Sequence, residues 1–178
     1  MPTIITHAVT ALALPALADK KYLIKKLLLL SVILSILPDA DVLTFYFNVP
    51  YDSFWGHRGF FHSLFFGFLI SGFFTYLFFK KDNLRLKNKM AVWGLLFAVI
   101  ASHGIFDAMT NGGYGIALFS PFTNQRFFLP WTPIEVSPIG LSRFLSERGA
   151  IVLWSEIKWI WFPLAGLLGA RYLIQKLR

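Results

Sequence analysis

Five apolar runs alternate with polar connections along this chain. They cover residues 3–18, 23–37, 60–79, 90–109 and 152–174. A helix needs about 20 apolar residues to cross the hydrocarbon of a bilayer, and about 17 at the low end. The first run is shorter than this and predicts a tilted or partly sunken helix. The pattern as a whole predicts an all-α, polytopic membrane bundle of about five spanning helices.

Composition agrees with this fold class. Apolar residues make up 56% of the chain, aromatic residues 18% and charged residues 15%, whereas a soluble domain has about 45–50% apolar and about 25% charged residues. A chain of 178 residues predicts one integral membrane domain, residues 1–178. The chain has no cysteine, which excludes disulfides, thiolate ligands and a cysteine nucleophile.

The formal charge of +8 is unevenly distributed. Twelve of the seventeen Lys and Arg residues lie in three clusters beside apolar runs, at residues 20–26, 80–89 and 171–178. This pattern is typical of the positive-inside rule and not of a nucleic-acid-binding groove. With five spans, all three clusters face the cytoplasm. We therefore expect an extracytoplasmic N-terminus and a cytoplasmic C-terminus.

Two connections are rich in aromatic residues. Residues 42–59 contain Asn, Pro and Gly breakers and predict an extracytoplasmic loop. Residues 110–150 form a longer connection, whose aromatic content favours an ordered, lid-like segment. Within it, Asn111-Gly112-Gly113 indicates a tight turn that could face a site. Glu135 could be a ligand or a base, although a solvated acid is the more ordinary interpretation.

Four histidines provide the candidate chemistry, and the five-span topology puts all of them on the extracytoplasmic side. His103 and Asp107 are four residues apart and share one helix face. Such a pair can bind one metal together, or the carboxylate can orient the imidazole. A hydrogen-bonded polar pair is the alternative, but ionisable groups inside a span are costly and indicate function.

Asp39 and Asp41 follow Pro38 at the end of the second run, where the helix dipole disfavours negative charge. A divalent cation would offset that charge, although a solvated turn is the alternative. In the His57-Arg58-Gly-Phe-Phe-His62 stretch, one histidine is expected to bind from the loop and the other from the first turn of the third span. Arg58 could meet an anionic substrate or a lipid headgroup.

Taken together, these motifs resemble the YdjM-like membrane-bound metal-dependent hydrolases. The resemblance covers most of the chain and rests on His7, Pro38-Asp-x-Asp41, His57-Arg-Gly-x-x-His-Ser63 and Ser102-His-x-x-x-Asp107. Phe61 stands where the family pattern has a small polar residue. The order of motifs is also similar to the helical zinc-dependent phospholipases C and nucleases. A later His-x-x-x-Glu is missing, because His103 is the last histidine, and this argues against a three-metal site.

The resemblance implies a multi-pass hydrolase of the cell (inner) membrane. We expect a divalent metal, with Zn favoured and Mn or Fe compatible. Asp39 is the candidate base or bridging ligand, with Arg58 as the second catalytic candidate. The candidate ligands are His7, Asp39, Asp41, His57, His62, His103 and Asp107.

The expected substrate is a phosphoester of a membrane lipid or lipid-linked molecule, because the site lies at headgroup level. No nucleic-acid partner is expected. A carrier that uses the same residues for protons or metal remains an alternative, as does a b-type haem protein with two axial histidines.

Overall fold

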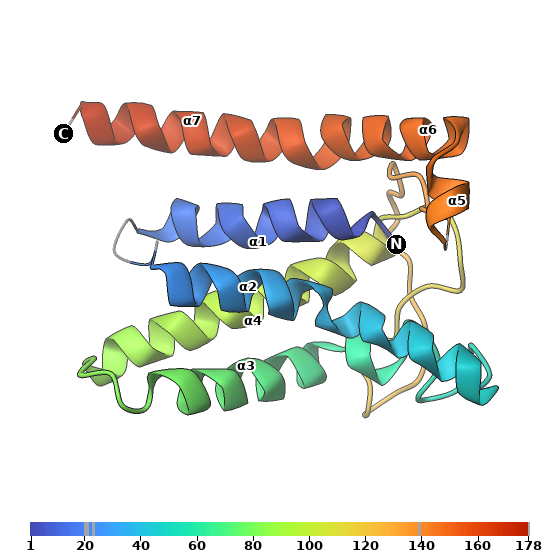
Figure 1. Cartoon of the computed structure of the whole chain (residues 1–178), viewed down its shortest axis with the longest axis horizontal. Helices are drawn as coiled ribbons and strands as arrows, with labels where there is room; N and C mark the ends of the chain where they lie inside the picture. Colours follow the sequence, from blue (N-terminus) through green and yellow to red (C-terminus); the bar gives the residue numbers. More distant parts are fainter. Residues whose placement is uncertain (20–21, 23, 139, 178) are drawn as a thin grey trace.

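The structure, a computed structural model, describes residues 1–19, 22, 24–138 and 140–177. Its regular secondary structure is helical. The described residues form no β-strands, only two isolated bridges, Thr110 with Ile134 and Ile116 with Phe127. The main helices are α1 (Ile4–Ala18), α2 (Lys25–Ile36), α3 (Leu64–Phe79), α4 (Leu86–Ala108), α6 (Glu147–Glu156) and α7 (Phe162–Lys176) (Figure 1).

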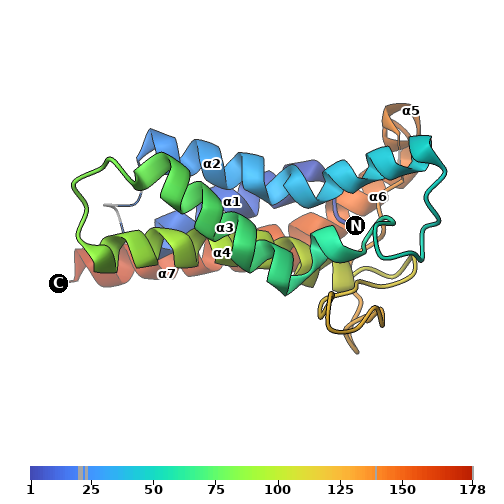
Figure 2. The same ribbon diagram turned by 90° about the horizontal axis from the view of Figure 1, so that it is seen from below.

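The helices run roughly side by side along the long axis of the molecule (Figures 1 and 2). α3 packs on α4, α1 packs on α2, and α4 and α7 both contact α1. α6 continues through a π-helical segment, η4 (Ile157–Trp161), into α7. The N-terminus lies at the end of the molecule opposite the C-terminus (Figure 1).

Three helices of the described chain are long and apolar enough to cross a membrane: Lys25–Phe47, Leu86–Ala108 and Glu147–Lys176. α1 and α3 have 15 and 16 residues. At about 1.5 Å per residue they are shorter than the roughly 30 Å of bilayer hydrocarbon. The predicted all-α membrane bundle is confirmed, with three full-length helices and two short ones.

Where the second run ends, the structure differs from the sequence prediction. Pro38 does not end the helix; the chain continues as a 3-10 helix, η2 (Leu37–Phe47), with Pro38 in its first turn. Proline is tolerated in a first turn, because the N–H that it lacks has no intrahelical partner there. The predicted loop over residues 42–59 therefore begins only at Asn48, which adopts a left-handed conformation with φ 53°. Asp39 and Asp41 consequently lie on a helix and not in a turn.

The long connection is ordered against the loop that precedes α3. The amide of Ala117 donates to the carbonyl of Arg58 (3.1 Å), and the amide of Leu64 donates to the carbonyl of Leu118 (3.0 Å). The connection also carries the one-turn helix α5 (Leu141–Phe144). The last run begins earlier than predicted, at Glu147 instead of residue 152.

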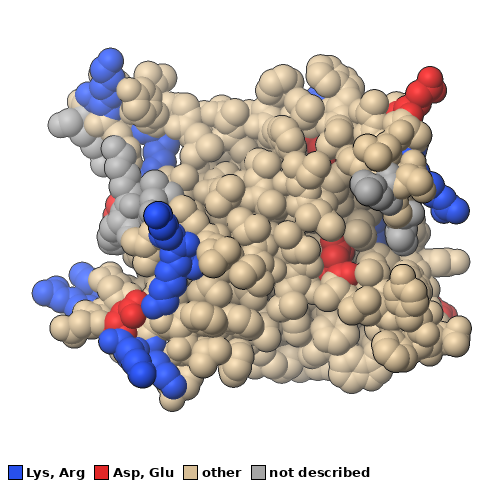
Figure 3. All heavy atoms as spheres, in the orientation of Figure 1, with Lys and Arg blue, Asp and Glu red and all other residues tan. Residues whose placement is uncertain are grey.

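One apolar cluster joins helices α2, α3 and α4. Leu27, Leu34, Leu96 and Ile100 are buried between α2 and α4, and Phe79 closes the cluster from α3. At that end of the molecule Lys26 pairs with Asp82 at 2.9 Å. Figure 3 shows that many Lys and Arg residues gather at the end where the C-terminus lies. Lys20, Lys21 and Arg178 of the predicted clusters lie outside the described residues.

Candidate metal centre

His103 and Asp107 lie in the last turns of α4, and both side chains are fully buried. As the spacing predicted, they share one face of the helix, and the Nε2 atom of His103 lies 3.9 Å from Oδ2 of Asp107. The Nδ1 atom of His103 lies 2.7 Å from the carbonyl oxygen of Ser35 on α2. A carbonyl can only accept, so Nδ1 carries the proton and Nε2 presents its lone pair to the interior.

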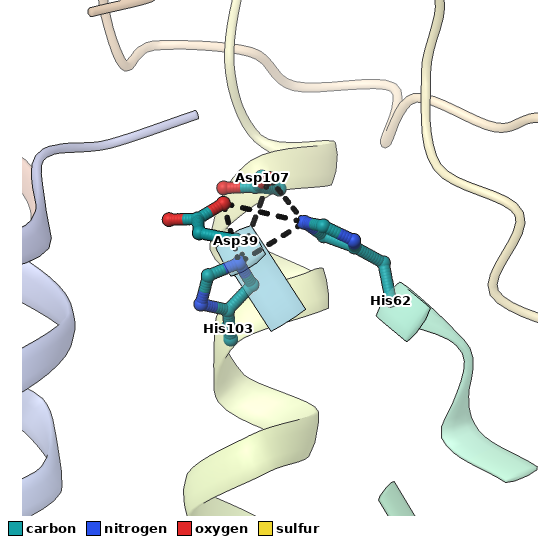
Figure 4. Close-up of side chains that lie close together, drawn as sticks. All are labelled: Asp39, His62, His103 and Asp107. Carbon is teal, nitrogen blue, oxygen red and sulfur yellow. Dashed lines mark hydrogen bonds and ion pairs between the residues drawn. The ribbon is translucent and has the colours of Figure 1, made fainter. Parts of the chain in front are cut away.

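Two further residues complete the cluster. His62 comes from a short 3-10 turn, η3 (Phe60–His62), and Asp39 comes from η2. Figure 4 shows both side chains converging on His103 and Asp107. Ligand atoms of Asp39, His62, His103 and Asp107 all lie within 4.8 Å of one another, and all four residues are buried.

The spacing of these ligand atoms fits one cation. Nε2 of His62 lies 3.2 Å from Nε2 of His103 and 3.5 Å from oxygens of Asp39 and Asp107. Nε2 of His103 lies 3.3 Å from Oδ1 of Asp39. Ligands at the corners of a tetrahedron, each about 2.1 Å from a zinc ion, are roughly 3.4 Å apart. The set can therefore hold a divalent metal ion.

The unpaired oxygens of the two carboxylates also favour a bound cation. Both oxygens of Asp39 and both oxygens of Asp107 are buried without a hydrogen-bond donor in the described part of the chain. Leaving buried carboxylates without compensation is costly. A divalent ion held by His62, His103 and Asp107 would also offset the charge of Asp39 beside it, and His with carboxylate ligands suits Zn, Mn or Fe.

Asp41 lies behind His62 and contacts a second histidine. Its Oδ2 is 3.0 Å from Nδ1 of His62, and its Oδ1 is 2.5 Å from Nδ1 of His57. Carboxylates commonly orient metal-binding imidazoles in this way. Asp41, His57 and His62 are also close enough to form a second group that could hold an ion. Asp41 thus orients His62 in the first group and is a candidate ligand in the second.

A model of the YdjM inner membrane protein family matches residues 1–177. The chain belongs to this family. It is also 38% identical over 172 residues to the inner membrane protein YbcI of Escherichia coli (strain K12), covering 95% of this chain and 96% of that protein. No solved structure matches the chain.

In this family member, His7 borders the cluster but does not join either group. Its ring stacks on that of His103 with centroids 3.8 Å apart, and its Nε2 lies 3.6 Å from Oδ1 of Asp107. Neither ring nitrogen has a hydrogen-bond partner among the described atoms. His7 therefore stays a predicted ligand. Its buried side chain lies beside Asp107, near the start of α1.

Arg58 is buried, with 1% of its surface exposed, and its guanidinium faces Asp107. Nε lies 3.6 Å from Oδ2 of Asp107, and Nη1 donates to the carbonyl of Gly112 at 2.8 Å. The Arg58 amide donates to Asp41 at 3.0 Å. Its φ of 64° lies in the left-handed region, which costs a non-glycine residue about 1–2 kcal/mol. The surrounding contacts hold Arg58 in place against this cost, so its side chain supports Asp107 from behind.

Glu135 lies apart from the cluster and forms an ion pair with Arg148 at 2.7 Å. A hydrogen bond with Asn111 and the charge of Arg148 lower the pKa of Glu135. The interpretation as a solvated acid therefore describes it better than that of a ligand. Of the Asn111-Gly112-Gly113 turn, it is the carbonyl of Gly112 that reaches the site, through Arg58.

Sequence reasoning missed two charged residues that shape the site, the half-buried Arg126 and the fully buried Glu156. Arg126, in the long connection, donates to the carbonyls of His57 (2.9 Å) and Tyr51 (2.7 Å) and so holds the loop. Glu156 is fully buried at the end of α6 and accepts hydrogen bonds from Thr3 and Thr6 at the start of α1. An acid inside an apolar run was the available signal for Glu156.

Proposed function

We propose that this protein is a membrane-bound, metal-dependent hydrolase that cleaves a phosphoester of a lipid or lipid-linked substrate at the extracytoplasmic face. One observation carries the proposal. Two imidazoles and two carboxylates converge in a buried site, and none of the four carboxylate oxygens has a hydrogen-bond partner among the described residues. Such a donor set is suited to a divalent ion of the kind that hydrolases use.

The residues divide into three roles. His62, His103 and Asp107 would hold the ion, in the His₂-carboxylate combination of several catalytic zinc sites. When bound, the ion lowers the pKa of a water molecule and neutralises charge that develops on phosphate oxygens. Asp39 would accept a proton from the water whose oxygen bonds to phosphorus, and would return that proton to the leaving oxygen as its bond to phosphorus breaks. Asp41 and the Ser35 carbonyl orient the two imidazoles.

The position of the cluster favours hydrolysis over transport. A carrier would need polar groups along a path to the other side of the membrane. Below the cluster, Leu27, Leu34 and Leu96 fill the space between α2 and α4. The carboxylates of Asp39 and Asp107 surround the two histidines closely, so the pair is also a poor match for axial ligands of a haem.

The test uses purified protein reconstituted with a panel of phospholipids and polyprenyl phosphates, with and without chelator, and mass spectrometry of the products. Wild type should give a chelator-sensitive product. Asp39→Asn should keep its metal and lose turnover by at least about a hundredfold, the lower end of the range for a general base. Metal-loaded protein that cleaves no phosphorylated lipid would overturn the proposal and favour the carrier.

A further inference from the structure

An apolar groove of about 370 Å³ opens beside the start of α1 and reaches the candidate metal centre. Its wall is formed mainly by apolar residues, among them Ile4, Ile5, Val42 and Phe144, and Asp39 is its acidic member. This volume lies within the range of about 300–1,000 Å³ that is usual for small-molecule sites.

Asp39 belongs to both the groove and the metal cluster. Its Oδ1 lies 3.3 Å from Nε2 of His103, within the cluster. Figure 4 shows its other carboxylate oxygen turned away from the other three side chains, toward α1. The first turn of α1 also lines the groove. The groove therefore reaches Asp39, the residue that accepts the proton in the proposed reaction.

The groove is lined by exposed apolar side chains at the start of α1. Ile4 and Ile5 are 51% and 45% exposed, although both are large apolar residues. Such side chains on the outside of a membrane bundle contact lipid, and a groove between them accepts hydrocarbon without a desolvation cost. A water-soluble substrate would gain nothing from this wall. A chain attached to a phosphate would place its polar end at Asp39.

We infer that the groove lined by Ile4, Ile5 and Val42 binds one hydrocarbon chain of the lipid substrate, which enters sideways from the bilayer with its phosphoester toward Asp39. This inference rests on the proposed function for the direction of the headgroup. The occupancy of the groove by a lipid chain is independent of turnover. It can therefore be measured in protein that does not catalyse the reaction.

The experiment uses phosphatidylglycerol with a photoreactive diazirine in one acyl chain, in vesicles that contain the full-length protein. Ile5→Trp fills the groove, and Leu12→Trp is the matched control, because Leu12 lies on the same helix with nearly equal exposure of 46%. Cross-linked peptides are mapped in wild type, both tryptophan variants and Asp39→Asn. The same proteins are assayed with the lipid and with a soluble phosphodiester without acyl chains.

Cross-links should concentrate at residues 1–5 and 42 in wild type, Leu12→Trp and Asp39→Asn. In Ile5→Trp they should fall about tenfold, the factor that loss of contact with roughly two CH₂ groups produces. Cleavage of the lipid should fall similarly, while metal content and cleavage of the soluble ester stay unchanged. Cross-links spread evenly over the lipid-facing helices, or unaffected by Ile5→Trp, would overturn the inference. Groove-specific cross-links without cleavage of any phosphoester would overturn the proposed function and leave the groove as a lipid site.

Discussion

The Nε2 atoms of His62 and His103 lie 3.2 Å apart, although the two residues are 41 positions apart in the chain. The other nitrogen of His103 faces the carbonyl of Ser35, and the other nitrogen of His62 lies 3.0 Å from the carboxylate of Asp41. With those nitrogens protonated, two lone pairs face each other in the neutral rings. Either a proton or a metal ion between the two nitrogens would stabilise this pair, and the predictions on metal binding test the second case.

Removing a ligand should lower metal content. We expect His103→Ala and Asp107→Ala each to weaken binding by more than the roughly ten- to hundredfold that is typical of lost orienting contacts. Metal analysis of purified protein after dialysis measures this. Ser102→Ala is the matched control, since the Ser102 hydroxyl lies on the same helix and bonds to the carbonyl of Val99. Full metal occupancy in both ligand variants would mean that the pair on α4 is structural.

Arg58 should matter for stability more than for metal content. Arg58→Ala removes a cation beside Asp107, so attraction for a divalent ion is expected to persist. The apo-protein should be destabilised by about 3–5 kcal/mol, as is usual when one member of a buried ion pair is lost. Thermal unfolding and metal analysis of the same samples measure both effects. Arg148→Ala, which breaks a partly exposed pair with Glu135, should change unfolding by less than about 1 kcal/mol. Loss of metal with unchanged stability in Arg58→Ala would contradict this account.

Hydrophobic patterning predicted much of this fold. Long apolar runs such as residues 60–79 and 90–109 permit little except membrane helices, and the structure has α3 and α4 there. The boundary at Pro38 could not be predicted in the same way. A proline can end one helix or lie in the first turn of another. Which of the two occurs at Pro38 depends on how η2 packs against the turn at His62.

The sequence indicated that the candidate residues lie near one another, but not how they are arranged. The i, i+4 spacing put His103 beside Asp107, and topology put His62 and Asp39 on the same side of the membrane. Which of Asp39 and Asp41 faces His103 depends on the path of η2, a 3-10 helix that the sequence did not indicate. Backbone acceptors such as the Ser35 carbonyl carry no sequence signature at all.

Glu156 should be important for stability and for the position of α1. It accepts hydrogen bonds of 2.6 Å from the amide and hydroxyl of Thr3 and from the hydroxyl of Thr6, the residue before His7. Glu156→Ala leaves these buried donors without a partner, at about 1–3 kcal/mol each. Thermal unfolding in detergent should show a large loss. Glu147→Ala, on the exposed first turn of α6, should stay within about 0.5 kcal/mol of wild type. Similar unfolding of the two variants would show that the Glu156 contacts are dispensable.

The orientation of the protein in the membrane can be tested with single cysteines, because the chain has none of its own. Asp52 and Asn83 are both exposed, the first in the loop beside the site and the second between α3 and α4. The positive-inside rule predicts that Asp52→Cys reacts with a membrane-impermeant maleimide in intact cells and that Asn83→Cys reacts only after lysis. The reverse pattern of labelling would invert the topology and place the metal centre in the cytoplasm.

A substitution at Gly104 tests the geometry of the metal centre without replacing any candidate ligand. A Cβ atom at Gly104 would lie 2.8 Å from the carbonyl oxygen of His62, so Gly104→Ala must push the turn that carries His62 away from α4. Gly94→Ala is the matched control, because a Cβ there meets nothing within 4 Å. Both changes add one methyl group to the same helix and should favour helix formation by about 1 kcal/mol.

We expect Gly94→Ala to be neutral or stabilising with normal metal content. Gly104→Ala should weaken metal binding by about tenfold or more, since a ligand displaced by a few tenths of an ångström loses its fit to the ion. Equal metal affinity in the two variants, measured by competition with a chelator of known strength, would show that His62 is not held against α4 as a ligand.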